Sequence, residues 1–237
     1  SGLVVSRLMA RLCPPRPRPV LPTIGTMNEH DVHVLGAGIV GRCLALALAR
    51  AGLRVALQAE PARARGDSQD DDVRAYALNA ASVELLRGLK VWDALPPGAA
   101  TAVLDMHVQG DAHGAAIDFS AWQQRVSALA WITDAAVLER ELASAVRFAP
   151  HIDVITDPQA RVEAPLKALC EGKASATRAA LGVTFERHDY GHQAIAARLT
   201  SDRPHQGIAR QWFRAPDVLA LLPFDSPQPA HSYALVW

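Results

Sequence analysis

The most constraining feature of this chain is a run with the spacing Gly-X-Gly-X-X-Gly over residues 36–41. The residues before it, 31–35, are mostly apolar and predict a short buried strand. The residues after it, 39–51, are rich in Ala and Leu and predict a helix that is apolar on nearly every face. A second strand is predicted over 53–57, and Glu60 follows it. Strand, glycine turn, helix, strand and acid within about 30 residues form the pattern of a dinucleotide-binding βαβ unit.

Each glycine of this turn has a different expected task. Gly36 permits the tight turn, Gly38 lets the backbone approach a pyrophosphate, and Gly41 lets the helix pack closely on the strand. Ala37 and Ile39 complete the turn, and the free N–H groups at the helix N-terminus favour an anion there. An ordinary βαβ unit without a ligand is the alternative, and the intact flanking elements weigh against it.

Composition argues against several classes of protein. The 237 residues are 50% hydrophobic and carry 24 basic and 24 acidic side chains, so no nucleic-acid partner is predicted. The cysteines, at positions 13, 43 and 170, have unrelated spacings, which favours a reducing, cytoplasmic compartment over disulfides or zinc. His188 and His192 are four residues apart, but the residues between them favour a loop over a metal site. No apolar run reaches the ~18 residues that span a bilayer.

The two ends differ from the rest of the sequence. Residues 1–26 contain four arginines, no acid and a proline-rich stretch. We expect them to be a disordered or non-native extension, with a transit peptide or a basic tail as alternatives. The sequence stops at Trp237 on a strand-like run, from which we expect the chain to be a fragment of a longer protein.

The middle of the chain alternates between predicted helices and strands. A helix is predicted over 76–95, where apolar residues recur near helical spacing, and another over 135–148, with Thr133 or Asp134 as its cap. Strands are predicted over 103–108, 116–119, 128–132 and 152–155.

The character changes after residue 190. Four short runs rich in β-branched and aromatic residues are separated by turns that contain Pro and Asp; they are 192–200, 207–214, 218–224 and 232–237. This spacing predicts an antiparallel sheet distinct from the α/β first half.

Several segments together resemble a known family. They are the glycine turn, residues 74–82 and 85–92, and, in the second half, residues 190–194, 203–205, 209–213 and 219–223. The chain resembles the class A flavoprotein aromatic hydroxylases, above all the ubiquinone-biosynthesis hydroxylases related to para-hydroxybenzoate hydroxylase. The resemblance implies an α/β fold in which a Rossmann-like FAD-binding domain (27–100 and 126–185) carries an antiparallel β-sheet substrate domain (101–125 and 186–237), here incomplete.

The resemblance also implies an activity. FAD would bind at the glycine turn, NADPH or NADH would be the co-substrate, and O2 would hydroxylate an aromatic ring of a ubiquinone-biosynthesis intermediate. Such a substrate can carry a polyprenyl chain, so peripheral membrane contact and a place in a ubiquinone-biosynthesis complex are expected. The flavin carries the reactive oxygen in this chemistry, so no triad or metal is needed and no catalytic residue is assigned.

The family's cofactor contacts carry over unevenly. Gly36, Ala37, Gly38, Ile39 and Gly41 match the turn, and Arg74 matches an arginine that contacts the flavin, the alternative being a surface arginine paired with the acids at 70–72. The ribose-binding acid is assigned to Glu60, which lies one residue beyond the family's usual position at Ala59.

Three departures bear on whether this chain is active. Glu171 and Gly172 stand where the family has Asp-Gly, the preceding stretch 157–169 is short, and the family's later Gly-Asp segment lies beyond Trp237. We therefore expect the fragment itself to be inactive. The rival interpretation is a degenerate, non-catalytic accessory protein or lipid-quinone binder; a non-oxygenating flavoprotein, a halogenase and an NAD-dependent dehydrogenase fit less well.

Overall fold

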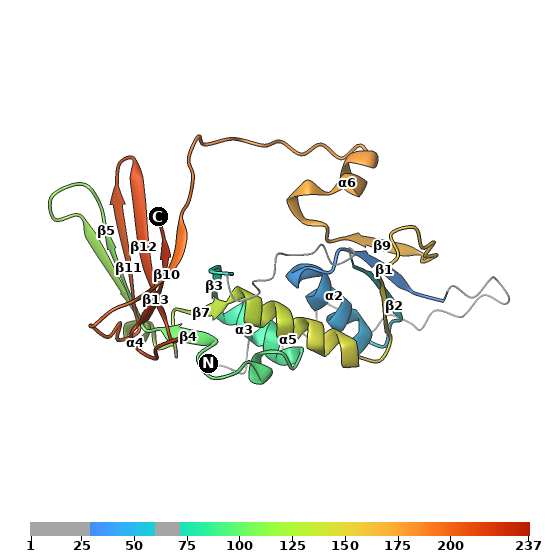
Figure 1. Cartoon of the computed structure of the whole chain (residues 1–237), viewed down its shortest axis with the longest axis horizontal. Helices are drawn as coiled ribbons and strands as arrows, with labels where there is room; N and C mark the ends of the chain where they lie inside the picture. The colour runs from blue at the N-terminus through green and yellow to red at the C-terminus, as the bar shows by residue number, and fades with distance from the viewer. Residues whose placement is uncertain (1–28, 60–71) are drawn as a thin grey trace, which may run out of the picture.

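The computed structural model describes residues 29–59 and 72–237, which form three sheets. A parallel sheet with its helices lies at one end of the molecule and a six-stranded sheet at the other, with a three-stranded sheet between them (Figure 1). The helices α2, α3 and α5 lie on the side of the parallel sheet that faces the centre of the molecule.

The parallel sheet has the order β8-β2-β1-β9, and each neighbouring pair is parallel. Its elements are β1 (Val32–Leu35), α2 (Ile39–Arg50), β2 (Val55–Gln58), α3 (Ala80–Gly88), the 3-10 helix η2 (Trp92–Ala94), α5 (Ala135–Phe148), β8 (Ile152–Ile155) and β9 (Leu166–Leu169). The predicted strand–turn–helix–strand unit is confirmed. A single strand, β9, precedes Glu171 and Gly172 and runs beside β1.

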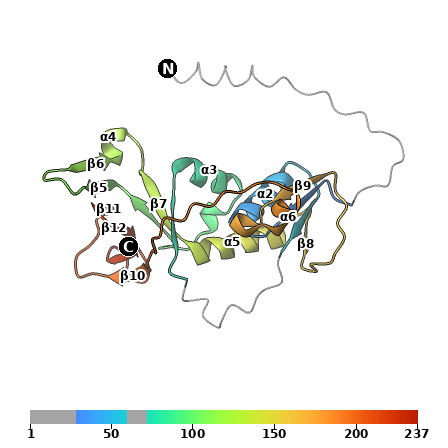
Figure 2. The same ribbon diagram turned by 90° about the horizontal axis from the view of Figure 1, so that it is seen from above.

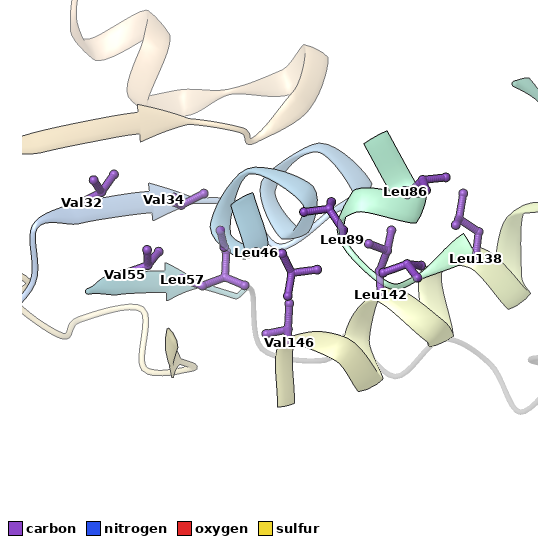
Figure 3. Packing of buried hydrophobic residues seen from close by; sticks show 12 residues of the cluster. Val32, Val34, Leu46, Val55, Leu57, Leu86, Leu89, Leu138, Leu142 and Val146 are labelled. Carbon is purple, nitrogen blue, oxygen red and sulfur yellow. The ribbon is translucent and has the colours of Figure 1, made fainter. Parts of the chain in front are cut away.

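The first core lies between this sheet and the helices. Figure 3 shows Leu46 of α2 lying between the strand residues and the side chains of α3 and α5. The fully buried members include Val34, Val55 and Leu142, each 0% exposed. Helix α2 is therefore covered by sheet and helices together, as its apolar composition predicts.

The helix predicted over 76–95 is wrong at its start. Residues 75–78 form the strand β3 (Ala75–Leu78), which pairs with β7 (Ala130–Asp134), and α3 begins only at Ala80. The Asn79 side chain accepts a hydrogen bond from the backbone N–H of Ser82 at 2.9 Å and so caps α3. Apolar spacing near helical period continues through the strand, so local pattern alone does not separate the two elements.

The three-stranded sheet, in the order β3-β7-β4, contributes one face to each of two cores. Alternate residues of a strand point to opposite faces. In β3, Tyr76 and Leu78 pack on the first core, whereas Ala75 packs on the second. The second core contains Val103 of β4 (Ala100–Val103), Ile132 of β7, and Ala209, Phe224 and Ala234 of the six-stranded sheet.

The six-stranded sheet has the order β10-β13-β12-β11-β5-β6. Its strands are β5 (Asp105–Gln109), β6 (Ala116–Ser120), β10 (Ala196–Thr200), β11 (Ile208–Arg214), β12 (Asp217–Phe224) and β13 (Ser232–Val236), and the short helix α4 (Ala121–Gln124) follows β6. The predicted antiparallel sheet is confirmed, except that β11 pairs with β5 in parallel. The sheet thus joins the middle of the chain to its last 42 residues (196–237).

The segment between the two ends of the molecule has little regular structure. After the 3-10 helix η3 (Gly172–Ala174) and the short helix α6 (Ala176–Ala180), residues 181–195 form no helix or strand. This segment runs from the parallel-sheet end to β10 (Figures 1 and 2). Among the described helices, none is long and apolar enough to cross a membrane.

Candidate functional site

The glycine turn joins the end of β1 to the start of α2 and packs against the end of β9. Gly36 has a φ of +103°, and a Cβ placed there would lie 2.5 Å from the carbonyl oxygen of Cys170. A Cβ at Gly41 would lie 1.8 Å from the carbonyl oxygen of Gly36. Both positions require glycine, because any side chain would collide with backbone.

Gly38 differs from the other two glycines. Its φ of −73° is available to any residue, and among the described atoms none lies within 4 Å of a Cβ placed there. Gly38 immediately precedes α2, whose first turn holds no acidic side chain. The first backbone N–H groups of α2 have no partner within the helix and lie at its positive end, next to this open position. Ala37 and Ile39 are partly buried and pack against the first core.

Arg74 lies immediately before β3 and is held by two acids. Its guanidinium donates to Asp72 through Nε at 2.8 Å and through Nη2 at 2.6 Å, and Nη2 also reaches Glu139 of α5 at 3.3 Å. The hydrogen bonds to Asp72 raise the pKa of Arg74. The side chain is 48% exposed and forms the ion pair of the alternative interpretation, while it still faces solvent.

Helix α5 connects Arg74 to the glycine turn. Arg42, on the first turn of α2, donates to the backbone carbonyl of Glu139 at 2.9 Å. Asp134, one of the two predicted cap residues, caps α5 by accepting from the backbone N–H of Val137 at 3.0 Å. Glu139 thus meets Arg42 through its main chain and Arg74 through its side chain.

The Glu171–Gly172 segment follows β9 and lies beside the turn. The Glu171 carboxylate accepts hydrogen bonds from Ser175 at 2.5 Å and Thr177 at 2.9 Å. Cys170 donates its backbone N–H to the carbonyl of Leu35 at 2.7 Å, which ties the segment to β1. The segment is thus adjacent to the turn, while its carboxylate is held by the residues that follow it.

The remaining predicted residues are Glu60 and the pair His188 and His192. Glu60 lies outside the described residues. His188 and His192 are exposed in the irregular segment 181–195, and no cluster of three or more metal-ligating side chains occurs among the residues that the structure describes. The loop predicted for these histidines is confirmed.

Sequence reasoning missed a polar cluster at the end of β12, where the six-stranded sheet meets β4. Asp225 accepts hydrogen bonds from Thr101 at 3.0 Å, from the backbone N–H of Ala230 at 2.7 Å and from His205 Nε2 at 3.2 Å. His205 Nδ1 accepts from the backbone N–H of Gly207, which leaves Nε2 as the donor. Burial raises the pKa of Asp225, but these hydrogen bonds outweigh it, so the pKa is lowered overall.

Sequence reasoning also missed Arg198, a charged residue inside a predicted strand. It reaches the backbone carbonyl of Arg74 and the Asp134 carboxylate from β10. Its only sequence signal is a cation in an otherwise apolar run, which is ordinary on a half-exposed strand.

Comparison with known proteins relates the glycine turn to FAD-binding domains. A family model described as "FAD binding domain" matches residues 29–146, which include the glycine turn, Arg74 and most of α5. The match covers 118 of the 237 residues, just under half of the chain. The resemblance to FAD-dependent aromatic hydroxylases, and the FAD cofactor it implies for the family, are thereby confirmed.

Curated relatives that this chain resembles carry the names of ubiquinol and ubiquinone hydroxylases. The 3-demethoxyubiquinol 3-hydroxylase of Escherichia coli (strain K12) is 49% identical over 72 residues, which cover 30% of this chain and 18% of that protein. The ubiquinone hydroxylase UbiL of Rhodospirillum rubrum is 28% identical over 240 residues, covering 91% of this chain and 53% of its own length. The chain therefore spans about half the length of UbiL and, at 48%, of UbiM of Neisseria meningitidis.

Solved structures confirm the fold. PqsL of Pseudomonas aeruginosa, in complex with 2-aminobenzoylacetate, has a TM-score of 0.66 at 17% identity and covers 87% of this chain and 60% of its own. An HpxO variant of Klebsiella pneumoniae complexed with FAD has a TM-score of 0.65 at 17% identity, covering 88% of this chain and 56% of its own. At these identities the likeness shows the para-hydroxybenzoate hydroxylase-like α/β fold alone.

Proposed function

We propose that the protein to which this chain belongs is an FAD-dependent monooxygenase. It would hydroxylate an aromatic ring of a ubiquinone-biosynthesis intermediate with NADPH or NADH and O2. The observation that carries the proposal is the open backbone at Gly38, directly before α2, within a matched FAD binding domain. The hydroxylase names of the curated relatives support the reaction class.

The turn fits a flavin diphosphate on grounds of packing and charge. Gly36 and Gly41 bring β1, α2 and β9 together, and Gly38 leaves room for a phosphate against the N–H groups of Ala37 and Ile39. Arg74 provides a cation near the same end of α5 that Arg42 contacts. We propose these residues, with Glu60 at the ribose, as the cofactor contacts. Bound FAD would supply the redox and oxygen chemistry, while the chain binds and orients it.

A domain division follows from the proposal. Residues 27–100 and 126–185 would form the FAD-binding domain, and 101–125 with 186–237 the substrate sheet. The six-stranded sheet supports this division because it joins β5 and β6 to the strands after residue 196. The middle sheet, which has a face in each core, would be the joint between the two parts.

The proposed substrate is aromatic and can carry a polyprenyl chain. One face of the six-stranded sheet continues past the second core with apolar side chains that are 43–53% exposed: Ile117, Phe213, Val218 and Val236. Such a face suits an apolar ring or chain. A cytoplasmic protein with peripheral membrane contact, and with partners in ubiquinone biosynthesis, is proposed on the same chemistry.

A second candidate is a non-catalytic accessory protein of the same fold. Glu171 stands where the resemblance expects Asp, and its carboxylate is engaged by Ser175 and Thr177. A protein that keeps the turn and has lost the use of this motif would bind a quinone-like ligand without turnover.

An absorbance experiment tests the proposal. The purified chain and a longer protein that contains it would be mixed with FAD, desalted and treated with NAD(P)H. We expect flavin bands that NAD(P)H bleaches in the longer protein. Retained flavin without bleaching would favour the accessory protein, and no flavin in either sample would contradict the proposed function.

A matched pair of variants locates the binding. Gly38→Asp places a carboxylate at the open position without a backbone clash and should abolish FAD retention while the fold remains. Gly88→Asp, at an exposed position at the end of α3 with no described atom near its Cβ, is the control and should retain FAD.

A further inference from the structure

Arg198 is a partly buried cation that connects two sheets. It lies on β10, its side chain is 18% exposed, and its guanidinium carbon lies 3.8 Å from the centroid of the Phe224 ring. Nη2 donates to the backbone carbonyl of Arg74 at 2.8 Å and to Asp134 at 3.3 Å. Within the described part of the chain, its Nη1 is buried and has no hydrogen-bond partner.

Packing alone does not explain an arginine here. Burying a guanidinium is unfavourable unless its donors are used, and an apolar residue of similar size would fill the same space on Phe224. Burial lowers the pKa of Arg198, opposed by the charges of Asp134 and Asp72. The charges of the two acids therefore offset only part of the effect of burial. The hydrogen bonds of Arg198 are long-range. They reach 64 and 124 residues back along the chain rather than to the neighbouring strands.

A chain of contacts connects Arg198, through α5, to the start of α2 beside the glycine turn. One oxygen of Asp134 accepts from Arg198, and the other caps α5. Glu139, on the second turn of that helix, meets the guanidinium of Arg74 and, through its carbonyl, Arg42 of α2. The main chain of Arg74 is thus held from the six-stranded sheet, and its side chain from the FAD-binding side.

We propose that Arg198 is a positioning residue for the cofactor site. Arg198 holds the carbonyl of Arg74 and the residue that caps α5. It thereby fixes the position of the Arg74 guanidinium between the substrate sheet and the glycine turn. The inference rests on the proposed function, in which Arg74 contacts FAD. Arg198 acts through Arg74 and need not touch the cofactor.

A thermodynamic cycle tests the coupling. FAD dissociation constants would be measured by fluorescence titration for the wild type, Arg198→Met, Arg74→Met and the double variant, in the longer protein. We expect Arg198→Met to weaken FAD binding about tenfold, which is a typical coupling between connected sites. The double variant should bind no more weakly than Arg74→Met alone, because the effect passes through Arg74. Unchanged binding in Arg198→Met, or losses that add, would overturn the inference.

Two further variants separate positioning from folding. Arg214→Met, at an exposed position on β11 of the same sheet, should bind FAD like the wild type. Asp134→Asn removes the charge that Arg198 meets but keeps an N-cap oxygen, and should reproduce part of the Arg198→Met effect. Urea denaturation of each variant would show that it is folded at the titration temperature.

A measurement without FAD makes the two proposals distinguishable. Amide hydrogen exchange of β3 should become faster in Arg198→Met and remain unchanged in Arg214→Met. Unchanged exchange in Arg198→Met contradicts the inference whether or not FAD binds. If exchange is faster in Arg198→Met but the wild type fails to bind FAD, the contact from Arg198 to Arg74 is supported and the proposed function is refuted.

Discussion

The two ends of the molecule are built in different ways. At the parallel-sheet end, backbone meets backbone: Gly41 approaches Gly36, and Gly36 approaches Cys170, at distances that exclude a side chain. At the six-stranded end, side chains from distant segments meet, as Arg198 meets Asp134 and Asp225 meets Thr101. The approach of Gly41 to Gly36 follows from a short contiguous stretch, whereas the contact with Cys170 and those at the six-stranded end require distant segments to fold together.

The two ends are therefore expected to have different roles: the glycine turn binds the cofactor, and the six-stranded sheet helps to position Arg74. The turn needs only the local sequence around Gly36–Gly41 and one neighbouring strand to present its N–H groups. The Arg74 segment lies between the two ends and is held from both. We therefore expect substitutions in the turn to act on the cofactor directly, and those in the six-stranded sheet to act through the middle sheet.

The largest loss of stability is expected from a substitution that breaks the backbone contact between Gly41 and Gly36. Gly41→Ala places a Cβ 1.8 Å from a carbonyl oxygen and should destabilise the protein by ~4 kcal/mol or more. Gly38→Ala, with open space at its Cβ among the described residues, is the matched control and should change stability by less than about 1 kcal/mol. Urea denaturation measures both, and equal effects would show that the turn is less tightly packed than its geometry indicates.

The next effect compares the two cores. Leu142→Ala, at a position 0% exposed in the first core, should cost about 2–5 kcal/mol. Phe224→Ala, 1% exposed in the second core, should cost about 3–5 kcal/mol. Because the middle sheet has a face in each core, both variants should unfold in a single transition.

Leu85→Ala provides the control for these core substitutions. Leu85 is 53% exposed on α3, and its truncation should cost less than about 1 kcal/mol. Thermal melts followed by near- and far-ultraviolet circular dichroism would detect a second transition, which would mean that the two ends unfold independently.

A smaller effect concerns the joint between β3 and α3. Asn79→Ala removes the oxygen that caps α3 and should cost about 1 kcal/mol. Asn79→Asp keeps a capping oxygen and should be nearly neutral. Equal losses in the two variants, measured by urea denaturation, would assign the effect to packing instead of to the cap.

The smallest effect is a pH dependence at the six-stranded end. The folded state lowers the pKa of Asp225 below its ordinary 3.8, so its stabilising contribution is complete above that pH and is lost as the pH falls toward the lower folded value. Between pH 5 and pH 3, stability should therefore fall less steeply in Asp225→Asn than in the wild type. Thr101→Val, which removes one of the hydrogen bonds, should give an intermediate slope.

The failed prediction at 76–95 shows where local pattern stops being informative. The apolar residues of β3 recur close to helical spacing, and only pairing with β7 makes this segment a strand. The same holds for the parallel pairing of β5 with β11, whose partners are about 100 residues apart. Arg198 could not be assigned from sequence because its partners, at positions 74 and 134, become neighbours only in the fold.

The sequence by itself determined the glycine turn, the strands and helix around it, and α5 with a polar cap at residue 133 or 134. These depend on contacts within a few residues, where glycine conformation, apolar period and capping oxygens dominate. Only the tertiary structure decided which strands pair, which face of β3 meets which core, and how Arg74 is held from both ends. The physical reason is that burial and hydrogen bonding between distant segments outweigh local propensity once those segments meet.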